Sequence, residues 1–253
     1  MSDLYPDFVA RFYDPVYARV RDGVDNEFYL ARMAAAGGPV LEIGSGTGRL
    51  LREALRRGID AWGVDLSQAM VERCRAQLPA EQSERVSVAD AVSMRLGRRF
   101  TLVAAPFRVL SHVPSIEDQL RLLDTVHEHL VPGGAFVFDL YVPNLKLLLE
   151  GMSESCDFDG EWAPGRRLRR FTSSAPADLS RQTNRVRMRF EWEEENGEHR
   201  DTWEFEMRFY FRFEIVHLVA RSKLRLEALH GDFAAGPLTA ESREYVVVCR
   251  RDA

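Results

Sequence analysis

The fold of this chain is decided by the stretch Leu41-Glu42-Ile43-Gly44-Ser45-Gly46-Thr47-Gly48, which runs from a short apolar strand straight into a predicted helix. Glycine lets the backbone turn sharply and approach a ligand closely, because no Cβ stands in the way. The amide groups at the start of the helix would then face that ligand. The stretch therefore predicts a strand, a turn and a helix that together bind a ligand.

Strands and helices alternate after this turn, and a helical pattern precedes it. Apolar residues recur at spacings of three and four through residues 1–36, up to the break at Gly37-Gly38-Pro39. Strands are predicted at 40–43, 61–64, 85–89, 100–105 and 135–141, with helices at 49–57, 67–78 and 116–130. This alternation implies right-handed crossovers and a parallel sheet, so the predicted fold class is α/β.

A different pattern begins after Pro143. Residues 144–165 are predicted to be irregular, and strands follow at 167–173, 184–195 and 199–212. The pattern then returns to that of the first half, with a helix at 214–220 and strands at 224–229 and 245–249. Strands in quick succession without helices between them predict an antiparallel β insertion in the α/β core.

Asn196-Gly197, a strong hairpin signal, lies between the last two strands of this insertion. If these two residues form the loop, Phe190 faces Trp203 on an apolar face, and Arg189 faces Glu204 on a charged face. The apolar face must then be buried, either on the core or on a second subunit, and the latter would make the protein a homodimer through the insertion.

Composition and charge exclude several classes of protein. The chain has 253 residues, is 45% hydrophobic and carries a net charge of −5, so we expect neither a nucleic acid nor a membrane as its partner. The longest apolar stretch, 100–107, is far shorter than a membrane-spanning helix. Acidic residues at positions 3 and 7 speak against a targeting segment, and three scattered cysteines against a disulfide framework or a metal site. We therefore expect a cytoplasmic protein.

Three carboxylates indicate the kind of ligand. Glu42 lies in the turn, Asp65 ends the second strand and Asp90 follows the third, so all three converge where the strand order of such a sheet reverses. They would repel a pyrophosphate, and Arg49 stands where the dinucleotide motif G-x-G-x-x-G requires glycine. S-adenosylmethionine carries an ammonium and a sulfonium and has no phosphate, so it suits this site better than a nicotinamide dinucleotide.

These motifs resemble the class I S-adenosylmethionine-dependent methyltransferases. The resemblance covers residues 40–142, includes Gly63-Val64-Asp65-Leu66-Ser67, Val88-Ala89-Asp90-Ala91 and Leu130-Val131-Pro132-Gly133-Gly134, and resumes in the last thirty residues. It implies a Rossmann-like doubly wound sheet of seven strands in the order 3-2-1-4-5-7-6, with the last strand antiparallel. The implied division is a helical cap at 1–36, a cofactor-binding core at 37–142, an insertion over the substrate site at 143–212, and core-completing elements at 213–253.

The resemblance also implies which residues contact the cofactor. The glycine turn would face its methionine part, Asp65 its ribose and Asp90 its adenine amino group. The full set implied in this way is Tyr13, Glu42, Gly44, Ser45, Gly46, Thr47, Gly48, Asp65, Leu66, Met70, Asp90, Ala91, Pro106, Phe107 and Arg108. Within the class, the insertion resembles that of small-molecule N-methyltransferases acting on amino sugars or glycine.

Methyl transfer from a sulfonium is an in-line displacement in which the cofactor supplies the reactivity. A neutral amine needs little more than a route for its proton, whereas a hydroxyl benefits from a general base. Candidate catalytic residues are His112, a base or substrate anchor if not an ordinary loop histidine, and Tyr141, a pocket residue if not a rim aromatic. Asp139 is either a functional carboxylate or a hydrogen-bonded structural one. The predicted products are a methylated nitrogen or oxygen of a small molecule and S-adenosylhomocysteine.

Two alternatives stay open. A methyltransferase acting on RNA or protein would use the arginine-rich segment 166–189 for docking, although the acidic segment 191–206 lies opposite part of it in the predicted hairpin. That pairing favours a solvated face whose charges neutralise one another. The second alternative is a protein that binds S-adenosylmethionine without catalysis, because the sequence shows no obligatory base.

Overall fold

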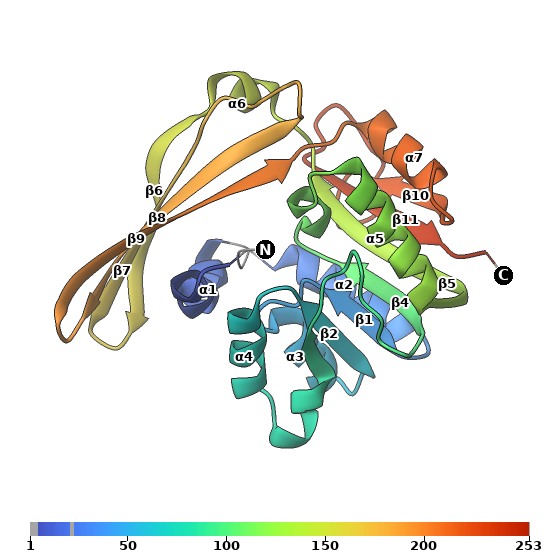
Figure 1. Cartoon of the computed structure of the whole chain (residues 1–253), viewed down its shortest axis with the longest axis horizontal. Helices are drawn as coiled ribbons and strands as arrows, with labels where there is room; N and C mark the ends of the chain where they lie inside the picture. Colours follow the sequence, from blue (N-terminus) through green and yellow to red (C-terminus); the bar gives the residue numbers. More distant parts are fainter. Residues whose placement is uncertain (1–4, 21–22, 253) are drawn as a thin grey trace.

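A computed structural model describes residues 5–20 and 23–252. Residues 1–4, 21–22 and 253 lie outside the described residues. They include the acidic residue at position 3, which was used as evidence against a targeting segment, and parts of the predicted segments at both ends of the chain. The described part of the chain forms two separate sheets, one of seven strands within the α/β core and one of four strands that projects from it (Figure 1).

The larger sheet has the order β10-β11-β5-β4-β1-β2-β3. Its strands are β1 (Val40–Ile43), β2 (Ala61–Asp65), β3 (Val86–Val88), β4 (Phe100–Ala105), β5 (Leu130–Tyr141), β10 (Arg225–His230) and β11 (Glu244–Arg250). The first five run parallel, and β11 is antiparallel to both β5 and β10. Since β10 and β11 are the sixth and seventh strands of the core, the predicted order 3-2-1-4-5-7-6 is confirmed.

Helices cover both faces of this sheet. One face packs against α2 (Val24–Ala35), α3 (Arg49–Arg56) and α4 (Gln68–Ala76), and the other against α5 (Ile116–His129) and α7 (Arg212–Ala220). Two short 3-10 helices, η1 (Ala80–Arg85) and η2 (Val109–His112), follow α4 and β4. The Ser67 and Ser115 hydroxyls accept hydrogen bonds from the Met70 and Asp118 amides, so both helices begin at serine caps.

The insertion contains one helix and one strand more than predicted. It begins with α6 (Leu145–Glu150) and forms an antiparallel sheet of β6 (Met152–Ala163), β7 (Arg166–Ser174), β8 (Thr183–Glu194) and β9 (Gly197–Arg208), in that order. The prediction that residues 144–165 are irregular is therefore wrong. β6 is an edge strand in which only Phe158 is buried, so it lacks the apolar alternation by which a strand is recognised.

The predicted hairpin register is wrong by two residues. Glu195 and Asn196 form the turn, while Gly197, with a φ of 125°, begins β9 and pairs with Glu194. Met188 therefore pairs with Trp203, and Arg187 with Glu204. A shift of two residues leaves each side chain on its predicted face, because the side-chain period of a strand is two.

The apolar face of this sheet is buried within the same chain. The helix α1 (Asp7–Val20) lies between the four-stranded sheet and the core (Figure 1). Phe12 is fully buried and packs with Leu168, Phe190 and Trp203 in one cluster. Burial of this face therefore needs no second subunit.

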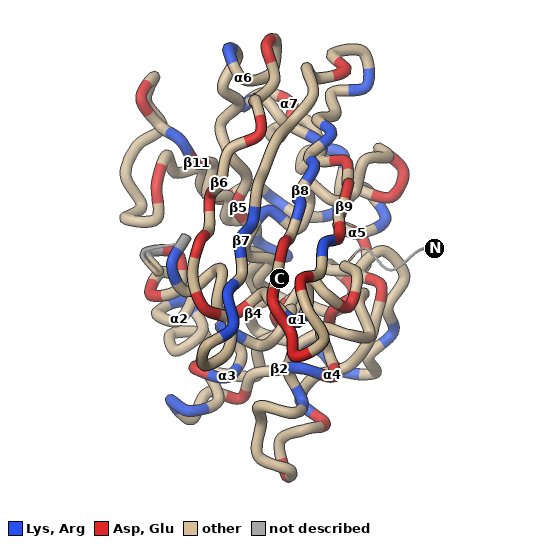
Figure 2. The backbone as a smooth tube through the Cα atoms, turned by 90° about the vertical axis from the view of Figure 1, so that its left-hand side faces the viewer, with Lys and Arg blue, Asp and Glu red and all other residues tan. Residues whose placement is uncertain are grey.

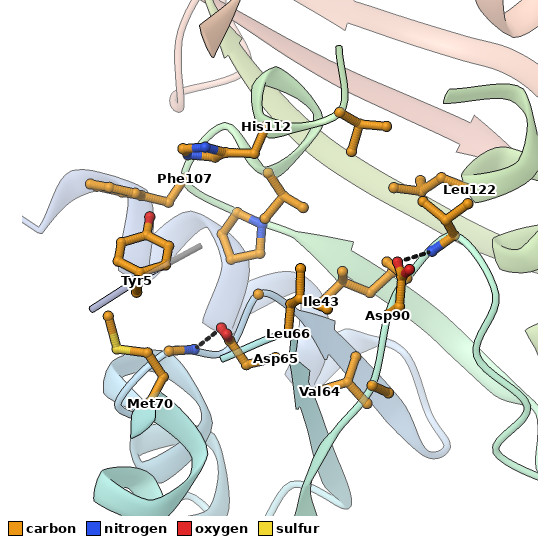
Figure 3. Close-up of a pocket in the computed structure, with 18 of the residues that line it drawn as sticks. Tyr5, Ile43, Val64, Asp65, Leu66, Met70, Asp90, Phe107, His112 and Leu122 are labelled. Atoms are coloured by element: carbon orange, nitrogen blue, oxygen red, sulfur yellow. Dashed lines mark hydrogen bonds between the residues drawn. The ribbon is translucent and has the colours of Figure 1, made fainter. Parts of the chain in front are cut away.

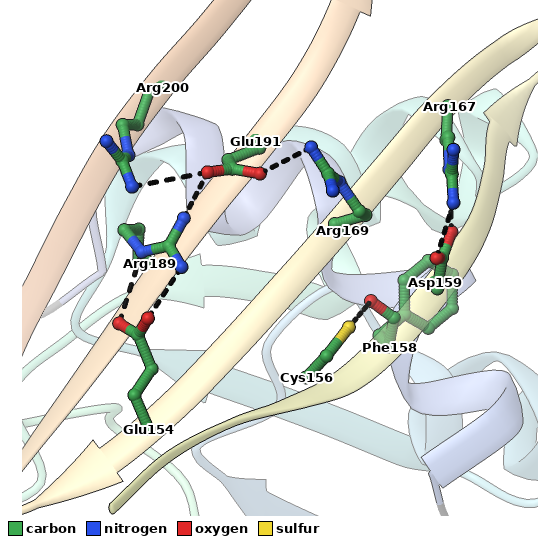
Figure 4. Close-up of polar contacts among 9 residues, drawn as sticks. All are labelled: Glu154, Cys156, Phe158, Asp159, Arg167, Arg169, Arg189, Glu191 and Arg200. Atoms are coloured by element: carbon green, nitrogen blue, oxygen red, sulfur yellow. Dashed lines mark hydrogen bonds and ion pairs between the residues drawn. The ribbon is translucent and has the colours of Figure 1, made fainter.

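The outer face of the same sheet carries paired charges, and basic and acidic segments lie side by side along its strands (Figure 2). Glu191 forms ion pairs with Arg169, Arg189 and Arg200 (Figure 4). Arg189 also forms an ion pair with Glu154, at 2.6 Å. The prediction that the basic and acidic segments neutralise one another is confirmed.

Candidate functional site

A cavity lies at the carboxyl ends of β1, β2, β3 and β4 (Figure 3). The predicted residues that line it are Tyr13, Gly44, Gly46, Asp65, Leu66, Met70, Asp90, Ala91, Pro106, Phe107 and His112. The remaining lining residues are apolar side chains of the core, together with Tyr5. Residues from the helical cap, the glycine turn and the ends of four strands thus meet at one place.

The glycine turn has the conformation that its sequence predicts. Gly44 and Gly48 have φ values of 71° and 86°, in the left-handed region that favours glycine. A Cβ on Gly44 would lie 2.6 Å from the Val109 side chain, and one on Gly48 would overlap with the Cys74 sulfur. Larger residues at these two positions would therefore both strain the backbone and clash.

Asp65 fixes this turn to the second strand. Its carboxylate accepts a hydrogen bond from the Gly46 amide at 2.8 Å (Figure 3). It also accepts one from the Ser67 amide at 2.9 Å. Burial raises the pKa of Asp65, while these amide hydrogen bonds act in the opposite direction. Asp90 lies at the end of the adjacent strand and accepts a hydrogen bond from the Val92 amide at 2.9 Å. Both acids are oriented by backbone groups and border the cavity.

Glu42, Ser45, Thr47 and Gly48 lie behind the cavity wall, although the resemblance implied contacts with the cofactor. Glu42 is only 4% exposed, and burial raises the pKa of its carboxyl to about 8. Among the described residues, its Oε2 atom has no hydrogen-bond partner. The Thr47 hydroxyl donates to the Asp14 carboxylate, which ties α1 to the glycine turn.

Aromatic rings from three distant segments meet at the other end of the cavity, and we name Tyr5, Tyr13 and His112 the aromatic end. The Tyr5 ring lies 6.2 Å from the His112 ring and 4.6 Å from that of Trp203. Phe205 lies 5.7 Å from His112 and stacks on Trp203. β9 of the insertion thus packs directly behind residues that line the cavity.

His112 has the properties of an uncharged hydrogen-bond acceptor. Burial lowers the pKa of its imidazole to about 4, so the ring is neutral near pH 7. Its Nδ1 atom is buried and has no hydrogen-bond partner within residues 5–20 and 23–252. A neutral imidazole of this kind can accept a hydrogen bond from a ligand, but it is a weak base.

Arg108 and Tyr141 are not at the cavity. The Arg108 guanidinium donates to the Glu244 carboxylate at 3.0 Å and lies 5.2 Å from the centre of the Tyr141 ring. Burial raises the pKa of Tyr141 to about 12. The ion pair with Glu244 directs Arg108 away from the cavity, so the structure does not bring these two predicted residues together with His112.

Sequence reasoning missed Tyr5, and it left the role of Asp139 open. Tyr5 precedes the apolar stripe of α1, so no periodicity singled it out. Asp139 is fully buried and hydrogen-bonded to Tyr29 and to the Phe107 amide.

Within the described residues, no cluster of His, Cys, Asp and Glu is arranged to hold a metal ion. In that same part of the chain, every helix is too short or too polar to span a bilayer.

Comparison with known families and curated proteins gives partial matches. A family model described as "Methyltransferase domain" matches residues 40–134. A dTDP-3-amino-3,4,6-trideoxy-alpha-D-glucopyranose N,N-dimethyltransferase of Streptomyces venezuelae is 29% identical over 100 residues, covering 40% of this chain and 41% of that protein. A ubiquinone biosynthesis O-methyltransferase of Psychrobacter cryohalolentis is 32% identical over 127 residues, covering 47% of each. The chain spans about half the length of the curated relatives it matches.

Solved structures match over nearly the whole chain. The CcbJ methyltransferase from Streptomyces caelestis has a TM-score of 0.77 at 25% identity and covers 99% of both chains. A S-adenosylmethionine-dependent methyltransferase from Clostridium acetobutylicum has a TM-score of 0.79 at 18% identity, covering 95% of this chain and 98% of that one. The sugar N-methyltransferase KedS8 from Streptoalloteichus has a TM-score of 0.75 at 21% identity, covering 95% and 93%. The similarity in fold therefore includes the insertion.

Proposed function

Because the chain belongs to the class I S-adenosylmethionine-dependent methyltransferase family, we propose that it methylates a nitrogen atom of a small molecule. The observation that carries this proposal is the setting of His112, which lines the cavity and whose buried Nδ1 atom has no hydrogen-bond partner among the described residues. Burial also lowers the pKa of this imidazole to about 4. A hydroxyl acceptor benefits from a general base, whereas a neutral amine attacks through its own lone pair. The weak base at the aromatic end therefore favours an amine over an alcohol.

The residues around the glycine turn fit S-adenosylmethionine. Asp65 and Asp90 are held at the cavity by backbone amides, and Leu66 and Met70 supply apolar contacts between them. We assign Asp65 to the ribose hydroxyls and Asp90 to the adenine amino group. When bound, the cofactor supplies the electrophilic methyl group. The protein holds the acceptor in line with that group, and such alignment contributes about 7–11 kcal/mol to lowering a barrier.

His112 and the neighbouring rings form the acceptor side in this proposal. The buried Nδ1 atom of His112 would accept a hydrogen bond from the amine and orient it. Tyr5 and Tyr13 would cover the amine from the N-terminal cap, with Trp203 and Phe205 of the insertion behind them. The insertion would thus shape the substrate site through the residues it supports.

Two measurements test the proposal. S-adenosylhomocysteine is expected to raise the melting temperature, since a ligand at a hundred times its dissociation constant adds about 2.7 kcal/mol of stability. A response to NAD and none to S-adenosylhomocysteine would contradict the cofactor assignment. Transfer of labelled methyl groups to a panel of amines but not to matched alcohols would support the amine. Exclusive transfer to alcohols would overturn the choice of nitrogen, and no transfer to either would favour a binding protein without catalysis.

RNA and protein acceptors receive no support from the outer face of the insertion. Its arginines are paired with glutamates and aspartates, so few of them are available for phosphate groups. RNA binding would weaken steeply with salt concentration. We expect no salt-sensitive binding of transfer RNA in fluorescence anisotropy. Tight binding would instead support a methyltransferase that acts on RNA.

We also propose that the protein is a cytoplasmic homodimer that associates through the insertion. Its three cysteines are free thiols, as a reducing compartment favours. On α6, Leu145 and Leu149 are exposed beside Leu179 and Phe211, forming an apolar patch that a second copy would cover. Lys146 and Glu150 form an ion pair on the same helix, and in a two-fold contact each would face the opposite charge on the second copy.

Mixing two charge variants tests this contact. Lys146→Glu makes both charged positions of α6 acidic, and Glu150→Lys makes both basic. Each variant alone is expected to dimerise weakly, and an equal mixture to form heterodimers in sedimentation experiments. A wild-type monomer at all concentrations would contradict the dimer, and unchanged association of both variants would exclude this surface.

A further inference from the structure

The turn that follows β4 is strained. Phe107 and Arg108 have φ values of 63° and 65°, so two consecutive residues other than glycine adopt left-handed conformations. Each such residue costs about 1–3 kcal/mol and persists only where its surroundings hold it. Pro106 and Phe107 both line the cavity. The contacts that hold this turn therefore affect the geometry at which methyl transfer would occur.

Asp139 on β5 provides one of these contacts. Its Oδ1 atom accepts hydrogen bonds from the Phe107 amide at 2.8 Å and from the Tyr29 hydroxyl at 2.7 Å. The Asp139 and Tyr29 side chains are 0% and 1% exposed. A buried carboxylate needs hydrogen bonds to offset its lost hydration, so this arrangement is fixed rather than fluctuating with solvent. Asp139 therefore joins the strained turn to β5 and to α2.

The direction of the Phe107 amide sets the direction of the carbonyl before it. In a trans peptide the C=O and N–H groups point to opposite sides, and the described chain contains no cis peptide bond. Asp139 lies on the same face of β5 as Val137, which packs with Tyr29. A trans peptide would therefore direct the Pro106 carbonyl away from Asp139, and Pro106 itself lines the cavity together with His112.

We propose that Asp139 is a positioning residue for methyl transfer, which holds the Phe107 amide and so presents the Pro106 carbonyl to the amine acceptor. The inference rests on the proposed function, because the carbonyl would accept a hydrogen bond from an N–H group of the attacking amine. As the nitrogen gains positive charge, that hydrogen bond strengthens, and the transition state is stabilised more than the ground state. Asp139 itself does not contact the acceptor.

Substitutions at Asp139 test this role. Asp139→Asn keeps an oxygen acceptor for the Phe107 amide, Asp139→Glu moves it by one methylene group, and Asp139→Leu removes it. We expect kcat to fall by about 100-fold in Asp139→Leu and by about 10-fold in Asp139→Glu, since small misplacements have effects of this size. Asp139→Asn should stay within about fivefold of wild type, and the affinity for S-adenosylhomocysteine within about threefold in all three variants. Thr101→Val removes a hydrogen bond at the opposite end of the sheet and is the matched control.

The Phe107 amide resonance, measured by NMR with S-adenosylhomocysteine bound, reports the hydrogen bond without any substrate. We expect this resonance to move upfield and its hydrogen exchange to accelerate in Asp139→Leu, and both to change little in Asp139→Asn. An Asp139→Leu protein with wild-type kcat, or an unchanged Phe107 resonance, would overturn the proposal. If Asp139→Leu does not fold, equal kcat values for Asp139→Glu and wild type would overturn it. Failure of the wild-type protein to methylate any amine would instead contradict the proposed function, while the resonance would still test the positioning of the turn.

Discussion

At the glycine-turn end of the cavity, Gly44, Gly46 and Asp65 come from neighbouring elements of the chain, and the Asp65 carboxylate accepts a hydrogen bond from the Gly46 amide. At the aromatic end, Tyr5 and His112 come from the N-terminal segment and η2, and Trp203 of β9 packs behind them through side-chain contacts. The first end is built by one strand–turn–helix unit with the adjoining strand. The second depends on how three separate segments pack. Backbone geometry thus fixes the end to which the proposed function assigns the cofactor, while side chains that can vary independently shape the end to which it assigns the acceptor.

The largest effect is expected at the glycine-turn end. Asp65→Ala removes the acceptor of the Gly46 and Ser67 amide hydrogen bonds and the proposed partner of the ribose. We expect the affinity for S-adenosylhomocysteine to fall by about 100-fold or more, so that the ligand no longer raises the melting temperature. Asp124→Ala, which removes an acid exposed on α5, is the control. A full thermal response of Asp65→Ala would show that the turn does not need this carboxylate.

A smaller and more selective effect is expected at the aromatic end. Trp203→Phe reduces the ring that supports Tyr5, so we expect the KM for the amine to rise about three- to tenfold. The affinity for S-adenosylhomocysteine should change by less than about twofold, because Trp203 is remote from the glycine turn. Trp162→Phe alters a tryptophan of the same insertion, which packs on Phe12 of α1, and should leave both quantities unchanged. Equal losses of both affinities in Trp203→Phe would contradict the separation of the two ends.

The pH dependence of stability provides a third comparison. The pKa of Glu42 is about 8 in the folded protein and near 4.5 when unfolded, so folding favours the protonated carboxyl. Its contribution is fully present below about pH 4.5 and is lost as the pH rises through about 8. Glu42→Gln should therefore melt at a higher temperature than wild type at about pH 9, with the difference vanishing at about pH 4. Scanning calorimetry over this range checks the sign, and a difference that grows toward low pH would contradict it.

The smallest effect is expected on the outer face of the insertion. Glu191→Gln weakens three ion pairs that are partly open to solvent, and exposed pairs contribute about 0–1 kcal/mol each. We expect the free energy of unfolding, measured with urea, to fall by about 1 kcal/mol, and kcat and KM to stay unchanged. A large change in KM would show that this face takes part in the acceptor site.

The sequence predicted those parts of the molecule that depend on local rules. The order of the core strands follows from alternating strands and helices, and the left-handed glycines follow from their spacing. β6 was not predicted, because an exposed edge strand needs few apolar residues. The hairpin register was wrong because Gly197 takes its positive φ at the start of β9 and not within the turn.

Side-chain destinations were harder to predict than strands. Arg108 lies next to two cavity residues in the chain, but its partner Glu244 is on β11, so only the tertiary fold decides where it points. The meeting of Tyr5, His112 and Trp203 likewise depends on the placement of the insertion against α1. The residues implied for the cofactor came from motifs with fixed spacing, and most of them do line one cavity.

The helix α1 touches both parts of the site. Its Asp14 accepts a hydrogen bond from Thr47 in the glycine turn, and its Tyr13 lines the cavity at the aromatic end. Its Phe12 packs on the apolar face of the insertion sheet. Under the proposed function, a ligand that fixes α1 at one end would also fix the residues that α1 contributes at the other. Thermodynamic reciprocity requires that cofactor and acceptor would then change each other's affinity by the same factor. The proposal therefore makes α1 the element that would couple the two binding events.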